Sequence, residues 1–201
     1  MFGLPSDTVI NRPLRKETLY VNASLKPRVR EIIKDQIESV VVCHKLADGW
    51  VSKGETVEEI LIFEVKLRQR KLNKHVLPAI AQAIPYKILF ILTFGDEAQA
   101  WIEASDTFYH TDWLPFDGFM LKFEGLNLDA VYENLARQIA GGRLAGGGSI
   151  AEAVEIDKRR RKLEREIAVL EKKVASEKQF NRQVELNGEL KRLRAELEDY
   201  L

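Results

Sequence analysis

The sequence predicts an α/β fold, a mixed sheet with a βαβ crossover, followed by a C-terminal α-helical coiled-coil hairpin. Two strand patterns, residues 57–67 and 87–94, flank a helical pattern, which is the order of a crossover unit. From residue 150 onward, leucines recur on a seven-residue repeat. A glycine-rich stretch separates the two patterns. The predicted parts are therefore a mixed α/β domain (1–140), a glycine-rich linker (141–149) and a helical coiled-coil arm (150–201).

The first predicted helix begins near Ser24 and Pro27, because serine and proline are favoured at helix N-termini. Apolar residues then recur at helical spacing, and a strand follows over residues 40–46. In the next strand, positions 61, 63, 65 and 67 are all apolar, whereas the opposite face changes from isoleucine to Glu64 and Lys66. One face of this strand is therefore predicted to enter the core.

Asn73 is a good N-cap for the helix between the two crossover strands, and this helix is expected to stop before Pro85. Residues 87–94 form an apolar run typical of a buried strand. A strand, a helix and a strand in this order predict two parallel strands with a right-handed connection.

The rest of the domain is predicted as a hairpin and a final helix. Gly95-Asp96 predicts a turn into an antiparallel strand over 98–104, and residues 119–123 predict another strand before a helix over 128–140. Residues 105–118 lack periodicity but carry Phe108, Tyr109, Trp113 and Phe116. Two roles stay open for this segment, a packed lid and an exposed binding loop, and packing is favoured.

The arm carries two apolar stripes that do not share one register. The second stripe is offset by two positions from the first, so one straight helix cannot present both to a partner. A turn within residues 176–183 predicts an antiparallel hairpin, and a continuous, stuttered helix that dimerises is the alternative. The predicted seam consists of Leu163, Ile167, Leu170, Val174, Leu186, Leu190, Leu193 and Leu197.

The composition indicates the cellular compartment of the protein and the kinds of ligand it can attract. The chain has 201 residues with 31 basic and 31 acidic side chains, so no global field draws it to nucleic acid or anionic lipid. Its single cysteine, Cys43, excludes an internal disulfide and suits a reducing compartment. No apolar run reaches the roughly 20 residues of a membrane span, and the first residues do not resemble a signal peptide. These observations predict a cytoplasmic protein with no membrane contact.

Five segments of the chain are distinctive in combination. They are the opening Met-Phe-Gly-Leu-Pro, residues 57–67, residues 76–90, Thr111-Asp112-Trp113 and residues 177–182. Together they resemble an uncharacterised bacterial family of domains of unknown function, number forty-three ninety-one, over nearly the whole chain. The resemblance implies a setting beside methylase and helicase genes of restriction-modification or phage-defence type. It implies no activity and supplies no catalytic residues.

The sharpest chemical candidate is Glu64-Val65-Lys66. Nucleases of the restriction-enzyme core type place Glu-x-Lys on a central strand, where the carboxylate holds a divalent metal and the lysine stabilises charge at the attacked phosphate. Glu31 and Asp48 are candidate additional ligands for magnesium. The plainer interpretation is a solvated sheet face on which Glu64 and Lys66 pair with neighbours. The three histidines have no zinc spacing, so no metal site and no other cofactor is predicted.

A run of cations forms a strong local field at the start of the arm. Five consecutive positions surround the helix, so some must point away from a partner helix and can contact phosphates. The alternative is a solvated helix start with pairs such as Asp157–Arg161 and Lys162–Glu166. The candidate nucleic-acid or partner contacts are Lys158, Arg159, Arg160, Arg161, Lys162 and Arg165.

Taken together, the sequence predicts a non-catalytic accessory or interaction subunit of a bacterial DNA-handling system. Its expected ligand is a protein partner, such as a methylase or helicase of the same system, and nucleic acid is a second candidate. A homodimer through the arm is a third. The alternative function is a metal-dependent nuclease that uses Glu64 and Lys66 with magnesium.

Overall fold

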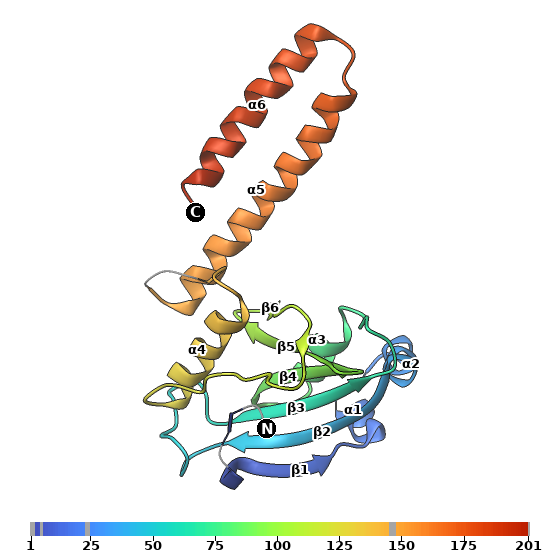
Figure 1. Cartoon of the computed structure of the whole chain (residues 1–201), viewed down its shortest axis with the longest axis vertical. Helices are drawn as coiled ribbons and strands as arrows, with labels where there is room; N and C mark the ends of the chain where they lie inside the picture. The colour runs from blue at the N-terminus through green and yellow to red at the C-terminus, as the bar shows by residue number, and fades with distance from the viewer. Residues whose placement is uncertain (1–2, 5, 23–24, 145–147, 201) are drawn as a thin grey trace. The chain divides into compact units, whose positions relative to one another are not determined.

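The computed structural model describes residues 3–4, 6–22, 25–144 and 148–200. The chain divides into two compact units, Met1–Gly142 and Arg143–Leu201. The first unit holds the sheet, and the second holds a pair of long helices (Figure 1). Among the helices of the described ranges, none combines the length and the apolarity that crossing a membrane requires.

The first unit is built on a mixed sheet of seven strands, as the predicted fold class requires. The first six strands lie in chain order, and the seventh shares the outer edge of β5 with β6. All neighbouring pairs are antiparallel except β3 and β4, which run parallel. The strands are β1 (Val9–Pro13), β2 (Ile37–Leu46), β3 (Ile60–Leu67), β4 (Lys87–Phe94), β5 (Glu97–Ala104), β6 (Thr107–His110) and β7 (Leu114–Pro115).

The predicted crossover is confirmed: α3 (Val76–Ala81) connects the parallel strands β3 and β4. This helix is shorter than expected at both ends. Its N-cap is His75 rather than Asn73, because the Asn73 side chain already accepts the His75 N–H at 3.0 Å in a turn just upstream. Turn residues replace the last expected helical turn before Pro85, whose ring disfavours helical geometry in the residue that precedes it.

Helices α1 (Lys16–Asn22), α2 (Pro27–Gln36) and α3 pack against one face of the sheet. The predicted apolar face of β3 lies in this cluster, where the rings of Phe63 and Phe90 meet edge to face at 5.8 Å. The opposite face is buried at the start of β3 as well, at Ile60 and Ile62. β4 is buried on both faces over residues 88–93, which explains its continuous apolar run.

Several elements of the first unit differ from the prediction. The sequence patterns predicted neither β1 nor α1. β6, which pairs with β5 in a second hairpin, lies in the segment that was expected to be a loop. Ser105 and Asp106 form its two-residue turn with φ angles of 42° and 60°. Tyr109 of β6 is fully buried, so the packed alternative is correct for that strand.

The strand predicted over residues 119–123 is wrong. The outer edge of β5 is already occupied by β6 and β7. The backbone of Lys122 instead bonds the side chain of Gln138, through an N–H donated at 3.2 Å and a carbonyl that accepts at 3.3 Å. Gln138 belongs to α4 (Leu128–Ile139), which Asn127 caps and which packs against β5 and β6. The segment is therefore fastened to a helix rather than to a sheet edge.

Two strand boundaries also shift. β2 begins at Ile37, directly after α2, rather than at residue 40. β3 begins at Ile60 rather than at residue 57, because the preceding N–H groups donate to the carboxylate of Asp129. Ser24, the predicted start of α2, lies outside the described residues, whereas Pro27 is the first residue of that helix.

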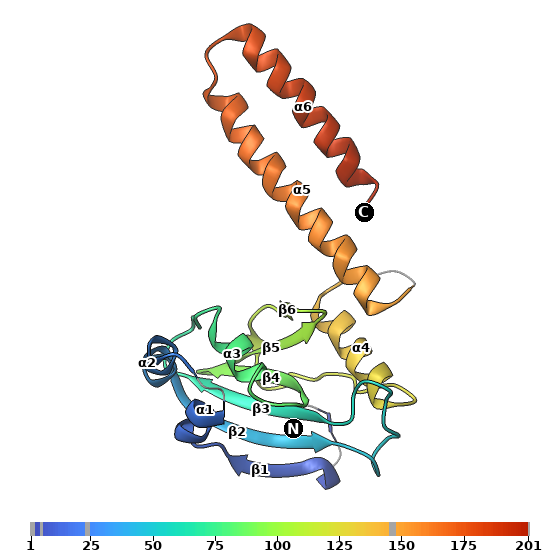
Figure 2. The ribbon, with the colours of Figure 1, turned by 180° about the vertical axis from the view of Figure 1, so that it is seen from behind.

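The second unit contains the predicted helical hairpin. α5 (Ile150–Ser176) and α6 (Phe180–Glu198) are joined by a three-residue turn, and they run antiparallel (Figure 2). Ser149 and Glu152 form a capping box at the start of α5. The predicted linker includes residues 145–147, which lie outside the described residues, while residues 141–144 form turns. The alternative of one continuous helix is wrong.

The predicted seam joins both helices of this hairpin. Leu163 is 1% exposed at the start of the seam. The apolar cluster that joins the two helices contains Ile167, Leu170, Leu186 and Leu190, with Val174, Leu193 and Leu197 packed against it. The turn between the helices therefore accounts for the offset between the two apolar stripes in the sequence.

Candidate functional site

The arm carries an open groove between α5 and α6 on one side of its seam. The groove has a volume of about 500 Å³. Val169 lies in this groove and is 54% exposed, although the neighbouring seam residue Leu170 is only 6% exposed. The complete lining consists of Lys162, Arg165, Glu166, Val169, Leu170, Lys173, Glu189 and Leu193. Apolar surface beside charges of both signs is typical of a surface that binds a partner.

An ion pair that joins the two helices lies outside this lining. Glu171 of α5 and Arg194 of α6 approach to 2.7 Å, and neither residue lines the groove. Such a pair can hold the helices together without covering Val169. The hairpin is therefore closed by its own contacts while the groove stays open.

The predicted cationic run is largely engaged within the arm. Lys158 pairs with Glu155 at 2.7 Å, and Arg159 pairs with Glu196 of the other helix, which raises the pKa of Arg159. The Nε of Arg165 donates to a backbone carbonyl one turn earlier, at 3.0 Å. The local positive field is consequently smaller than the number of cations suggests.

Arg160 and Arg161 bind a buried carboxylate. Both guanidinium groups contact Asp157, at 2.9 and 2.7 Å, and the Asp157 side chain is fully buried. The side chains of Arg160 and Arg161 are only 18% and 32% exposed. They are therefore structural partners of Asp157, and the more exposed cations of the run are Lys158, Arg159, Lys162 and Arg165.

The structure places Glu64 and Lys66 on β3, each beside a different neighbour. The Lys66 ammonium lies 2.8 Å from a Glu38 oxygen, and this hydrogen bond lowers the pKa of Glu38. The Cys43 thiol lies 3.6 Å from a Glu64 oxygen. Burial raises the pKa of Cys43 to about 11, and the charge of Glu64 adds to that effect, so the thiol stays protonated at neutral pH.

The two additional acidic candidates lie on other elements. Glu31 belongs to α2, and Asp48 follows β2 in a turn beside Gly49. Within the described ranges, no group of three or more histidine, cysteine, aspartate or glutamate side chains is arranged to hold a metal ion.

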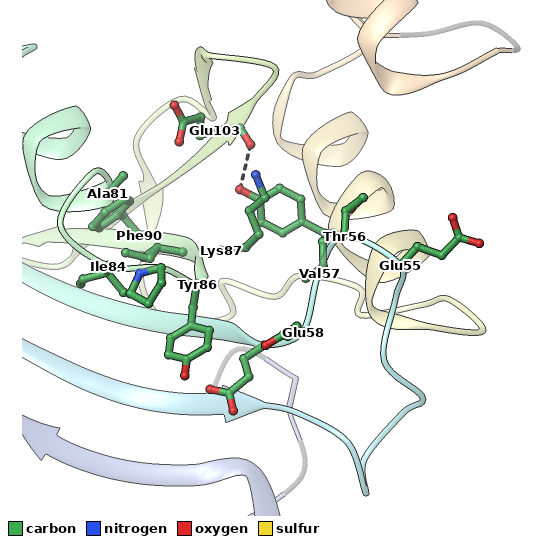
Figure 3. Close-up of a pocket in the computed structure, with 14 residues that line it drawn as sticks. Glu55, Thr56, Val57, Glu58, Ala81, Ile84, Tyr86, Lys87, Phe90 and Glu103 are labelled. Atoms are coloured by element: carbon green, nitrogen blue, oxygen red, sulfur yellow. Dashed lines mark hydrogen bonds between the residues drawn. The ribbon is translucent and has the colours of Figure 1, made fainter.

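A second hollow, of about 460 Å³, lies at the start of β3 and β4 (Figure 3). Its lining combines apolar side chains, among them Ile84 and Phe90, with four glutamates and one lysine. The Lys87 ammonium lies 5.5 Å from the ring centre of Tyr132, and the Tyr132 hydroxyl donates to the backbone oxygen of Glu103 at 2.8 Å. The charged lining residues are Glu55, Glu58, Glu59, Glu103 and Lys87.

Asp129 holds one wall of this hollow in place. Its carboxylate accepts the N–H groups of Glu55 and Val57 at 2.6 and 2.8 Å, and the Thr56 hydroxyl at 2.8 Å. Burial opposes ionisation, but these hydrogen bonds prevail and lower the pKa of Asp129. Gly54 admits the carboxylate, since a Cβ there would lie 2.3 Å from the Asp129 Cγ. Sequence patterns did not indicate this clamp, because it joins residues more than seventy positions apart.

The electrostatics of the hollow disfavour anionic ligands. Burial raises the pKa of Glu103, while the positive charge of Lys87 opposes that shift. Glu59 is paired with Lys45 at 2.6 Å. With several carboxylates around one lysine, a phosphate group would meet net repulsion here. The hollow is therefore a poor site for nucleic acid, and the arm remains the better candidate surface.

No curated protein and no solved structure matches the chain significantly. A family profile described as a domain of unknown function, DUF4391, matches residues 2–197. The match includes both the sheet and the helical hairpin. The chain therefore belongs to the DUF4391 family, as the resemblance of its sequence indicated.

Proposed function

We propose that this protein is a non-catalytic interaction subunit of a bacterial DNA-handling system of restriction or phage-defence type. The observation that carries the proposal is the helical arm. Its two helices close their own seam and leave open a groove with apolar surface and charges of both signs. The setting beside a methylase or helicase comes from the sequence resemblance. The cytoplasm suits a protein whose one thiol is free and buried.

The energetics of the arm support a binding role. A two-helix hairpin needs only one apolar stripe on each helix, and here those stripes meet in the seam. Val169 and Phe180, 54% and 75% exposed, contribute further apolar surface that the seam does not use. Exposed apolar surface of this kind costs solubility, and a partner that covers it recovers about 25 cal/mol for each Å² removed from water.

The partner is expected to meet the more exposed cations at the start of α5. An acidic protein surface and a nucleic-acid backbone share one chemistry here, which is neutralisation of negative groups by lysine and arginine. Arg160 and Arg161 are excluded from this role because they already bind Asp157. Lys158, Lys162 and Arg165 are the cations to test, since their side chains reach water.

The test is co-purification of the full chain with the products of its neighbouring genes, together with a DNA and RNA binding assay over a range of salt. Changing Lys158, Lys162 and Arg165 together to glutamine should weaken binding and flatten its salt dependence. The matched control changes Lys172, Lys178 and Lys191, which are also exposed and lie elsewhere on the arm. If the parent chain captures neither a neighbouring protein nor nucleic acid, the proposed function is refuted.

A further inference from the structure

Apart from Arg165, the charges along the groove side of α5 and at its C-cap, Glu177, are complementary to their own reversed order. Reading from the N-terminal end, they run positive, negative, apolar, apolar, positive, negative. The spacing between successive positions is three or four residues, apart from the adjacent apolar pair, so the five positions on α5 lie within one face of the helix, and the sixth is the C-cap residue that follows it. These residues are Lys162, Glu166, Val169, Leu170, Lys173 and Glu177. The first five line the groove, together with Arg165 of the same helix.

A two-fold axis between Val169 and Leu170 turns this order into matched pairs. With two α5 helices antiparallel about that axis, Glu166 of each copy faces Lys173 of the other. In the same register Lys162 faces Glu177, and the exposed Val169 side chains of both copies lie at the centre. The arrangement yields four opposite-charge contacts around an apolar middle, which is the usual layout of an interface core and rim.

Other registers bring like charges together. A shift by seven residues in one direction sets Glu166 against Glu166 of the second copy, and the opposite shift sets Lys173 against Lys173. A parallel arrangement in register also opposes identical charges. The charge order therefore specifies one antiparallel register, in the way that flanking charges specify pairing in coiled coils.

The side chains of the outer pair are already partly ordered. Glu177 caps the turn after α5, where one of its carboxylate oxygens accepts the N–H groups of Lys178 and Gln179 at 2.8 and 2.9 Å. A carboxylate fixed in this way loses little further freedom when it meets a lysine. In the single hairpin Glu166 lies 3.8 Å from Lys162, a loose contact that leaves it available to a second partner.

We propose that two copies of this chain bind each other through these grooves, with the two α5 helices antiparallel at the centre of a four-helix bundle. The inference rests on the proposed function, because it names a second copy as one partner of the same arm. Burial of the exposed Val169 against the second copy supplies the apolar contribution, and the charges supply the register.

Sedimentation equilibrium of the full chain tests the proposal. The parent should self-associate reversibly, and Glu166→Lys or Lys173→Glu alone should raise the dimer Kd about tenfold or more, because each turns two attractions into repulsions. The double variant carrying both changes should restore association. So should an equal mixture of the two single variants, in which every 166–173 contact is again of opposite charge.

The control is Glu164→Lys, which makes the same change on the same helix outside the groove lining, at a side chain that is 53% exposed. It should leave the Kd unchanged. A parent chain that stays monomeric at all concentrations overturns the proposal, as does a double variant or a mixture that fails to recover association. A monomer that still captures a neighbouring protein refutes only this inference, whereas a dimer that captures no other partner supports it and refutes the proposed function.

Discussion

Leu170 is the most direct test of the hairpin seam. We expect Leu170→Asp to melt the arm while the sheet unit stays folded. The leucine is 6% exposed and belongs to a cluster with three other buried side chains. Because this cluster is small, the loss of one leucine removes a large part of its apolar contact. The next residue, Val169, is 54% exposed and provides a matched control within the same helical turn.

The size of the effect follows from the burial. Losing a buried leucine removes about 2 to 3 kcal/mol, and placing a carboxylate in an apolar seam costs at least about 2 kcal/mol more. A total of about 4 kcal/mol or more is large against what four buried side chains supply. Without the seam, α5 and α6 are single helices, which are marginal in water at such lengths.

Far-ultraviolet circular dichroism measures the outcome. α5 and α6 span 27 and 19 residues, whereas the longest other α-helix, α4, spans 12, so the arm supplies more than half of the helical signal. Leu170→Asp should lose that share, and Val169→Asp should keep it. Fluorescence of Trp101, which stacks on His110 in the sheet unit, should show that the sheet unit is intact in both. Full helicity in Leu170→Asp would refute the assigned seam.

Four further outcomes are expected. Asp129→Ala should lower the free energy of unfolding by about 2 to 4 kcal/mol in urea denaturation, because several N–H and hydroxyl donors lose their acceptor; an unchanged midpoint would contradict the clamp. Cys43 should resist alkylation at neutral pH until the chain is unfolded, since its pKa is about 11. Burial lowers the pKa of His44, so its contribution to stability is fully present above pH about 6.5 and is lost as the pH falls below that value. His44→Asn should therefore flatten the dependence of the unfolding free energy on pH below about 6.5. Finally, the purified protein should not cut DNA or RNA with magnesium or manganese, and cleavage that Glu64→Gln abolishes would establish the nuclease instead.

The centre of the sheet was predictable from the sequence because its residues satisfy one strong requirement. β4 is buried on both faces, so its pattern is a continuous apolar run. β6 was not predictable in this way. Its turn places Ser105 and Asp106 at positive φ, where glycine or asparagine is the usual marker, and the strand itself has only four residues.

The arm likewise has features that the sequence predicts and features that it does not. The seam follows from leucine spacing alone, since helical periodicity is a local property of the chain. The roles of Arg160 and Arg161 do not, because consecutive cations suggest a solvated face and nothing in the sequence marks Asp157 as buried. The hollow beside β3 and β4 was also missed, since its glutamates come from segments far apart in the chain and only the fold brings them together.

The short turn between α5 and α6 also determines how these two units reach their folded states. Residues 177–179 connect the helices, so the contacts of the seam join positions close in the chain and need little loop closure. The sheet must instead pair β2 with β3 and then set β3 beside β4 across an intervening helix. Chains dominated by local contacts fold orders of magnitude faster than those that depend on distant pairing. The arm is therefore expected to form while the strands of the sheet are still pairing, so that the helical hairpin is complete before the sheet.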